Sequence, residues 1–180
     1  LKMKLGEHEM KSNQSVADEI RKYMNYIYLI LFAGITMWYY LYSTVLEYKY
    51  PYALYLGLRY ALMAYVLVSI ALVVWQKQYS TVLEPVFMVL ILVSAGVVTY
   101  VVKDNAVFDF ALLLVGAKMY RGKELPIVYL CIAVVIQGIA YYASTTGIIA
   151  DITMQADRGV RHSLGIIYPT DMAAHVLFIM

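Results

Sequence analysis

The sequence predicts an all-α protein, a polytopic bundle of transmembrane helices, and three observations carry this prediction. Hydrophobic residues make up 63% of the 180 residues, while charged residues make up only 14%. A soluble domain carries about one quarter charged residues, because its surface must be wet. Apolar runs of roughly membrane length recur along the chain, and polar or Pro-containing segments separate them. We therefore expect an integral membrane protein whose main contact is the lipid bilayer.

Residues 1–22 form a polar leader with five basic side chains. We expect no packed core there, and helix only in its second half. No signal-peptide cleavage site is visible, so the first apolar run reads as an uncleaved anchor. The chain opens on Leu1 and ends at Met180 inside an apolar run, which favours a piece of a longer protein.

Residues 23–180 form the predicted transmembrane bundle. Five spans and the start of a sixth are expected, at residues 23–46, 52–75, 86–102, 106–120, 125–150 and from Thr170 onward. Pro85 lies where a first helical turn tolerates proline. The fourth run reaches only about 22 Å at ~1.5 Å per residue, against a hydrocarbon core of ~30 Å. It must thin the bilayer, use its flanks or lie partly inside the protein.

The basic residues favour a cytoplasmic N-terminus. In that orientation the inward segments hold nine of the 14 lysines and arginines, and the outward segments hold five. Five crossings then place the loop 151–169 outside the membrane. The many tyrosines near the ends of the first, second and fifth runs suit the lipid–water boundary. A stacking platform for sugars is the alternative interpretation of these rings.

Other classes of function find little support in the sequence. A net charge of +2 is too small to indicate nucleic acid. The chain has no phosphate-cradling glycine loop, no zinc-ligand spacing and no HExxH motif. The single cysteine, Cys131, lies in an apolar run and reads as a small filler. The glycines are expected at close helix contacts, at Gly57, Gly96, Gly116, Gly138 and Gly147.

The outward loop 151–169 combines two arginines with backbone breaks. Arg158 and Arg161 carry guanidinium forks, which suit phosphate and carboxylate oxygens. Pro169 ends the segment before Thr170 or Asp171 caps the next helix. That helix would present its positive end beside the arginines, an arrangement that favours anion binding. The alternative is an ordinary solvated loop.

The stretch RHSLGIIYPTD in this loop resembles the extracytoplasmic arginine motif of the Wzy-type polysaccharide polymerases, relatives of the O-antigen ligases. That motif often reads R-x-S-L-G-F-x-H-P-N. The matching residues are Arg161, Ser163, Leu164, Gly165 and Pro169. The departures are Ile166 for the aromatic residue, Tyr168 for the histidine and Thr170 for the asparagine. A histidine role therefore does not transfer to position 168.

The resemblance implies the N-terminal part of a bacterial cytoplasmic-membrane enzyme. Such enzymes join oligosaccharide repeat units carried on undecaprenyl diphosphate, outside the membrane and without a metal, nucleotide sugar or other cofactor. It further implies flippase and chain-length-regulator proteins as partners. Arg161 is the first candidate for stabilising the leaving diphosphate, and Arg158 is the second. His162 is the local candidate for proton acceptor, although the family's important histidine usually lies in a later loop. Substrate contacts would come from Ser163, Gly165 and Thr170.

Three further ionisable residues stand in apolar stretches. Asp109 is a candidate substrate contact, because an ionisable residue inside a membrane segment is costly and therefore suggests a function. Alternatively, it caps the fourth helix at the outer boundary, where a carboxylate interacts favourably with the helix dipole. Arg59 is a candidate for lipid-diphosphate contact, or it extends to the outer headgroups. His175 would share a helix face with Asp171, inside the bundle or lining a cavity.

Two other classes of protein compete with the polymerase. The first is a transporter or flippase for an anionic or lipid-linked substrate, with Arg158 and Arg161 as an outer gate. It should show related repeat halves, and the sequence has no visible internal repeat. The second is a small structural or immunity-type membrane protein. That interpretation predicts a complete chain, which the apolar ending disfavours.

Overall fold

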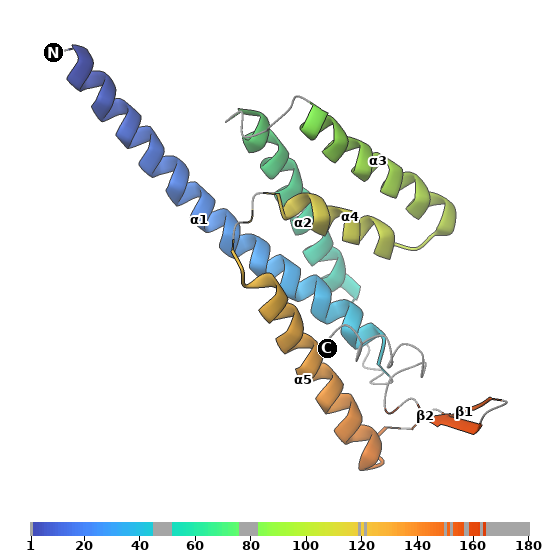
Figure 1. Ribbon diagram of the computed structural model, residues 1–180. Coiled ribbons are helices and arrows are strands. Elements are labelled where there is room, and N and C mark those ends of the chain that lie inside the picture. The colour runs from blue at the N-terminus through green and yellow to red at the C-terminus, as the bar shows by residue number, and fades with distance from the viewer. Residues whose placement is uncertain are drawn as a thin grey trace. The chain divides into compact units, whose positions relative to one another are not determined.

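A computed structural model describes residues 2–44, 52–75, 83–118, 120, 122–149, 151, 153–156, 159–162 and 164. Five helices and one two-stranded ribbon make up this part of the chain (Figure 1). It falls into two compact units, Leu1–Leu31 with Arg59–Gly122 and Phe32–Leu58 with Lys123–Met180. Each unit is described by itself below.

Helix α1 runs without a break from Lys2 to Tyr42. The leader and the first apolar run therefore form one helix, and the leader is more helical than the sequence suggested. The cause is local, because no proline interrupts this stretch and most residues of the leader are good helix formers. At the C-terminal end the hydroxyls of Ser43 and Thr44 donate to the carbonyls of Tyr40 and Leu41, at 2.8 and 2.7 Å. These bonds satisfy carbonyls that the helix leaves without partners.

Four helices in the described residues are long and apolar enough to cross a membrane. They are Glu19–Tyr42 within α1, α2 (Tyr52–Trp75), α3 (Leu83–Val102) and α5 (Leu125–Thr145). Large apolar side chains cover their outer surfaces, as Tyr100 and Val101 show with exposed fractions of 85% and 72%. Exposing these apolar faces to water would be unfavourable in free energy, so they are suited to contact with lipid. The helical membrane class predicted from composition is confirmed.

Helix α4 (Ala106–Gly116) is shorter than the predicted fourth run and pairs with α3. The two helices run in opposite directions, joined by a tight turn (Figure 1). Lys103 takes a left-handed conformation in this turn, with φ of 58°. The Asp104 carboxylate then accepts the Ala106 N–H at 2.9 Å, which satisfies one of the first free N–H groups of α4.

Helix α5 ends at Thr145, five residues before the predicted end. Gly147 adopts φ of 74°, the left-handed conformation that glycine takes most easily. The Ile148 N–H then donates to the Ala143 carbonyl at 2.9 Å, and the Gly147 N–H to the Ser144 carbonyl at 3.2 Å. This pair of bonds is a Schellman motif, so Gly147 is a helix stop and not the close helix contact that was expected.

The second unit packs the end of α1 against the beginning of α5. Tyr40 is 5% exposed and contacts Ala133 and Ile136, and its hydroxyl donates to that of Tyr129 at 2.8 Å. Tyr40 belongs to the last turn of α1, whereas Tyr129 lies in the second turn of α5. The two helices are therefore staggered along their length.

The loop predicted after the fifth run contains a β-hairpin. Strands β1 (Thr153–Ala156) and β2 (Gly159–His162) pair antiparallel, with Thr153 opposite His162 and Met154 opposite Arg161. The all-α class holds for the described helices, and this short ribbon is an element that the sequence did not predict. The sequence signal for these strands was weak, because each strand has only four residues. The presence of Gly165 and Pro169 instead favoured an irregular loop.

Close helix contacts occur at some of the glycines only. An added Cβ at Gly116 would lie 2.9 Å from Tyr28, so α4 needs glycine there, as predicted. At Gly96 the nearest atom, on Phe108, is at an ordinary 3.7 Å. Nothing lies within 4 Å of a Cβ added at Gly57 or Gly138, where the expected contact is wrong. A close approach that was not predicted occurs at Gly34, with Leu58 at 3.1 Å.

Candidate functional site

The first unit contains a buried ion pair between α2 and α4. Arg59 Nε lies 2.9 Å from Asp109 Oδ1, although the two atoms lack the alignment of a hydrogen bond. The Asp109 side chain is fully buried, and that of Arg59 is 16% exposed. The guanidinium carbon also lies 5.6 Å from the centre of the Phe108 ring, a cation–π contact.

This pair changes the interpretation of both residues. The Arg59 guanidinium is paired with a carboxylate inside the unit, a partner that the sequence did not suggest. Asp109 stands in the first turn of α4, but the carboxylate that bonds the start of that helix belongs to Asp104. The sequence identified both residues as unusual. It could not pair them, because 50 positions separate them and only the α2–α4 packing brings them together.

A second polar constellation joins the end of α5 to the hairpin. The Asp151 carboxylate uses both oxygens there. Oδ2 lies 2.5 Å from Nδ1 of His162, and Oδ1 accepts the Leu164 N–H at 2.9 Å. His162 is the last residue of β2, and Leu164 takes φ of 50° just after it. Asp151 therefore holds the His162 side chain and the Leu164 backbone, two residues of the R-x-S-L-G motif.

The remaining predicted site residues divide into two groups. Arg161 lies in β2, next to His162. Arg158, Ser163, Gly165 and Thr170 lie outside the described residues, as do His175 and the predicted sixth helix. The structure thus brings together Asp151, His162 and the backbone of the motif. Asp151 was not among the predicted site residues, and the only available signal was an acid directly after an apolar run.

A tyrosine cluster in the first unit was also missed. The Tyr28 hydroxyl donates to the Leu113 carbonyl at 2.6 Å, and its ring packs at 5.5 Å from both the Tyr65 and Tyr120 rings. Tyr28 is 1% exposed, so this ring packs inside the unit and does not face lipid or water. A boundary tyrosine and a buried tyrosine look alike in sequence, because both stand in apolar runs.

The end of α1 and the beginning of α2 carry a stack of aromatic rings in the second unit. The Tyr55 ring stacks on Trp38 with centres 5.0 Å apart, and Tyr39 and Tyr52 pack around it at 6.5 and 5.6 Å. Tyr55 is only 3% exposed. Its faces are occupied by other rings, so Tyr55 packs the helices together and offers no open platform for a sugar.

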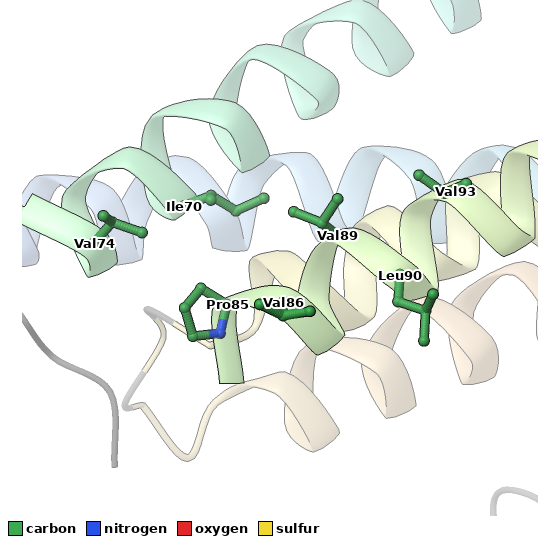
Figure 2. A pocket seen from close by; sticks show the side chains of 7 residues that line it. All are labelled: Ile70, Val74, Pro85, Val86, Val89, Leu90 and Val93. Carbon is green, nitrogen blue, oxygen red and sulfur yellow. The ribbon is translucent and has the colours of Figure 1, made fainter. Parts of the chain in front are cut away.

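An aliphatic groove lies between α2 and α3. Its volume is about 460 Å³, and Figure 2 shows its side chains, among them Ile70 and Val74 of α2 with Pro85, Val89 and Leu90 of α3. No side chain that lines it can hydrogen-bond a sugar. Because it lies within two candidate spans, its natural contact is hydrocarbon.

Within the part of the chain that the structure describes, no group of three or more His, Cys, Asp or Glu side chains could hold a metal ion. Comparisons with protein families, with curated proteins and with solved structures find no match. The fold defines a multi-pass helical membrane protein. Its function must be argued from the hairpin and the ion pair.

Proposed function

We propose that this chain is the N-terminal part of a membrane polysaccharide polymerase, which joins undecaprenyl-diphosphate-linked repeat units outside the bacterial cytoplasmic membrane. One observation carries the proposal. Arg161 lies in strand β2 of the hairpin that comes after α5, and the Asp151 carboxylate contacts the His162 ring and accepts the Leu164 N–H within the same motif.

The proposal requires the hairpin to face outward, and one contact supports this topology. Lys118, just after α4, forms an ion pair with Glu84 in the first turn of α3. The chain that leaves at Glu84 thus returns to the same level at Lys118. Because α3 is long enough to cross the membrane, this contact supports a return crossing by α4 and its following turn. With a crossing by α4, the crossings before the hairpin would number five, as the proposal requires.

The chemistry of the motif suits a diphosphate leaving group. Negative charge develops on the phosphate oxygens as the glycosyl bond breaks, and fixed cations lower the energy of that transition state. In this proposal Arg161 is the main candidate for the contact with the diphosphate, and Arg158 is the second candidate. Guanidinium forks bind two phosphate oxygens at once, which a lysine cannot do with the same geometry.

A carrier for anionic or lipid-linked substrates remains the second candidate, and the Arg59–Asp109 pair is the observation that favours it. Ionisable groups buried among membrane helices often line transport paths. A carrier predicts that substitution at this pair changes substrate passage, whereas the polymerase predicts that substitution in the hairpin changes chain length.

The test compares polymer length in the native host. With Arg161→Ala we expect long polymer to disappear and single repeat units to accumulate on the lipid carrier, because the leaving group loses its cation. Arg161→Lys retains the charge but not the fork, so it should restore only part of the long polymer. The matched control is Lys123→Ala, an exposed cation in the turn before α5. Long chains at unchanged membrane levels of the Arg161→Ala protein would show that the proposal is wrong.

A further inference from the structure

We infer that Asp151 is a positioning residue that holds His162 with its Nε2 atom as the proton acceptor for the incoming hydroxyl. This inference rests on the proposed function and deepens it, because it assigns the acid–base role to this loop. The sequence alone offered His162 only as a local candidate. The new element is its carboxylate partner, which lies 11 positions earlier in the chain.

The geometry defines which atoms are engaged. Nδ1 of His162 lies 2.5 Å from Asp151 Oδ2, and the second oxygen of the same carboxylate accepts the Leu164 N–H at 2.9 Å. Asp151 is thus anchored to the backbone while it holds the ring. Its side chain is 27% exposed, and that of His162 is 57% exposed. The carboxylate is half-sheltered at the base of the hairpin, and the ring is open to a substrate.

The chemistry of the carboxylate then fixes the tautomer. An ionised carboxylate can only accept hydrogen bonds, so the nitrogen that faces it, Nδ1, carries a proton. In the neutral ring the other nitrogen, Nε2, is therefore the one with a free lone pair. A carboxylate on Nδ1–H also stabilises the positive charge that appears when Nε2 accepts a proton. Orientation, tautomer and charge all make Nε2 the acceptor.

The reaction step balances with these groups alone. The acceptor-sugar oxygen bonds to the anomeric carbon of the donor glycan as the bond from that carbon to the phosphate oxygen breaks. The electron pair of the broken bond leaves with the lipid diphosphate. The hydroxyl proton passes to Nε2 of His162, and the imidazolium later returns it to the diphosphate or to water. Positioned general bases contribute about 10²- to 10⁴-fold in rate.

A structural staple for the hairpin is the competing role, and one variant separates the two. In His162→Asn the side-chain amide N–H replaces Nδ1–H, so the bond to Asp151 can persist while the acceptor nitrogen is lost. A staple predicts near-normal turnover for this variant. We expect kcat to fall at least about 100-fold in proteoliposomes supplied with lipid-linked repeat units, with little change in KM.

The Asp151 variants complete this experiment. Asp151→Asn should lower kcat at least tenfold, as loss of an orienting carboxylate does in comparable dyads, and Asp151→Glu should recover part of that loss. The double variant Asp151→Asn/His162→Asn should be no slower than His162→Asn alone, because the two residues act as one unit. Asp104→Asn is the matched control, a carboxylate in another interhelical turn, and should leave kcat unchanged.

A spectroscopic measurement tests the inference without any activity. The ¹⁵N shifts of the His162 ring should report a protonated Nδ1 and a bare Nε2 in the neutral form, and Asp151→Asn should reduce that preference. Predominance of the Nε2–H tautomer overturns the inference. Normal turnover of His162→Asn, together with an inactive Arg161→Ala protein, also overturns it while the polymerase proposal stands. Polymerisation by the Arg161→Ala protein removes the proposed function itself.

Discussion

At the scale of single residues, the Arg59–Asp109 pair is the most costly feature in the described chain. Each charge loses its hydration on burial, and their mutual attraction repays that loss only while both are present. The Phe108 ring adds a contact for the guanidinium. A pair of this kind is a weak source of stability, but it penalises any arrangement of α2 and α4 that separates the two groups.

Because each buried charge is compensated only by its partner, removal of one charge should destabilise the protein more than removal of both. Arg59→Met alone should lower the free energy of unfolding by about 3–5 kcal/mol, because the buried Asp109 carboxylate loses its cationic partner. The double variant Arg59→Met/Asp109→Leu should regain most of that loss, since no charge remains to be buried. Unfolding by SDS in mixed micelles measures both.

The control pair for this cycle is Glu84–Lys118, whose side chains are 25% and 37% exposed. Its disruption by Lys118→Met should cost no more than about 1 kcal/mol, because water and headgroups screen partly exposed charges. Equal losses for the two single variants would contradict the assignment of Arg59–Asp109 as a buried pair.

At the scale of the helices, α4 is held to α1 and α2 by close packing at one end. Tyr28 of α1 donates to the Leu113 carbonyl, and its ring lies over Gly116 beside Tyr65 of α2. A helix of 11 residues has little surface to bury, so contacts of this kind determine its position. Small residues allow such approaches between membrane helices.

Gly116→Ala should therefore destabilise the protein by about 1–3 kcal/mol, because the new methyl group meets the Tyr28 ring at 2.9 Å. Gly138→Ala is the matched control in α5, where a Cβ meets nothing within 4 Å. It should be neutral or stabilise by up to about 1 kcal/mol, since alanine favours helix. The same SDS unfolding measurement applies. A loss with Gly138→Ala equal to that with Gly116→Ala would show that the packing at Tyr28 is not the cause.

The comparison of these elements with the sequence shows what a linear pattern can and cannot specify. Composition and the length of the apolar runs identified the apolar helices, because both are properties of a continuous stretch of sequence. The stop of α5 at Gly147 needed backbone geometry, and the Arg59–Asp109 pair needed the packing of distant helices. In the candidate site, the motif with Arg161 and His162 was visible. Asp151 was not, since only the fold of the hairpin brings it to the ring.

At the scale of the whole molecule, the function depends on whether α4 makes a crossing. The Glu84–Lys118 contact supports a return to the side where α3 begins. The staggered contact of Tyr40 with Tyr129 points the other way. If residues 23 and 125 marked the same membrane face, Tyr40 would lie about 26 Å along α1 and Tyr129 about 6 Å along α5. The contact between Tyr40 and Tyr129 is therefore incompatible with α1 and α5 both starting at the same membrane face at residues 23 and 125.

Labelling of single cysteines decides between these topologies. In a Cys131→Ala background, which removes the chain's single cysteine, Thr153→Cys in the hairpin should react with a membrane-impermeant maleimide in intact cells. Lys123→Cys, in the turn after α4, should react only after permeabilisation, as should Ser12→Cys in the leader. These sites flank α5, so opposite labelling of positions 123 and 153 requires α5 to cross. Matching labelling of positions 12 and 123 further requires an even number of crossings between them, so α4 must cross if α1, α2 and α3 all do. If Thr153→Cys is protected until the cells are permeabilised, the arginine motif faces the cytosol, where an extracytoplasmic polymerase could not use it.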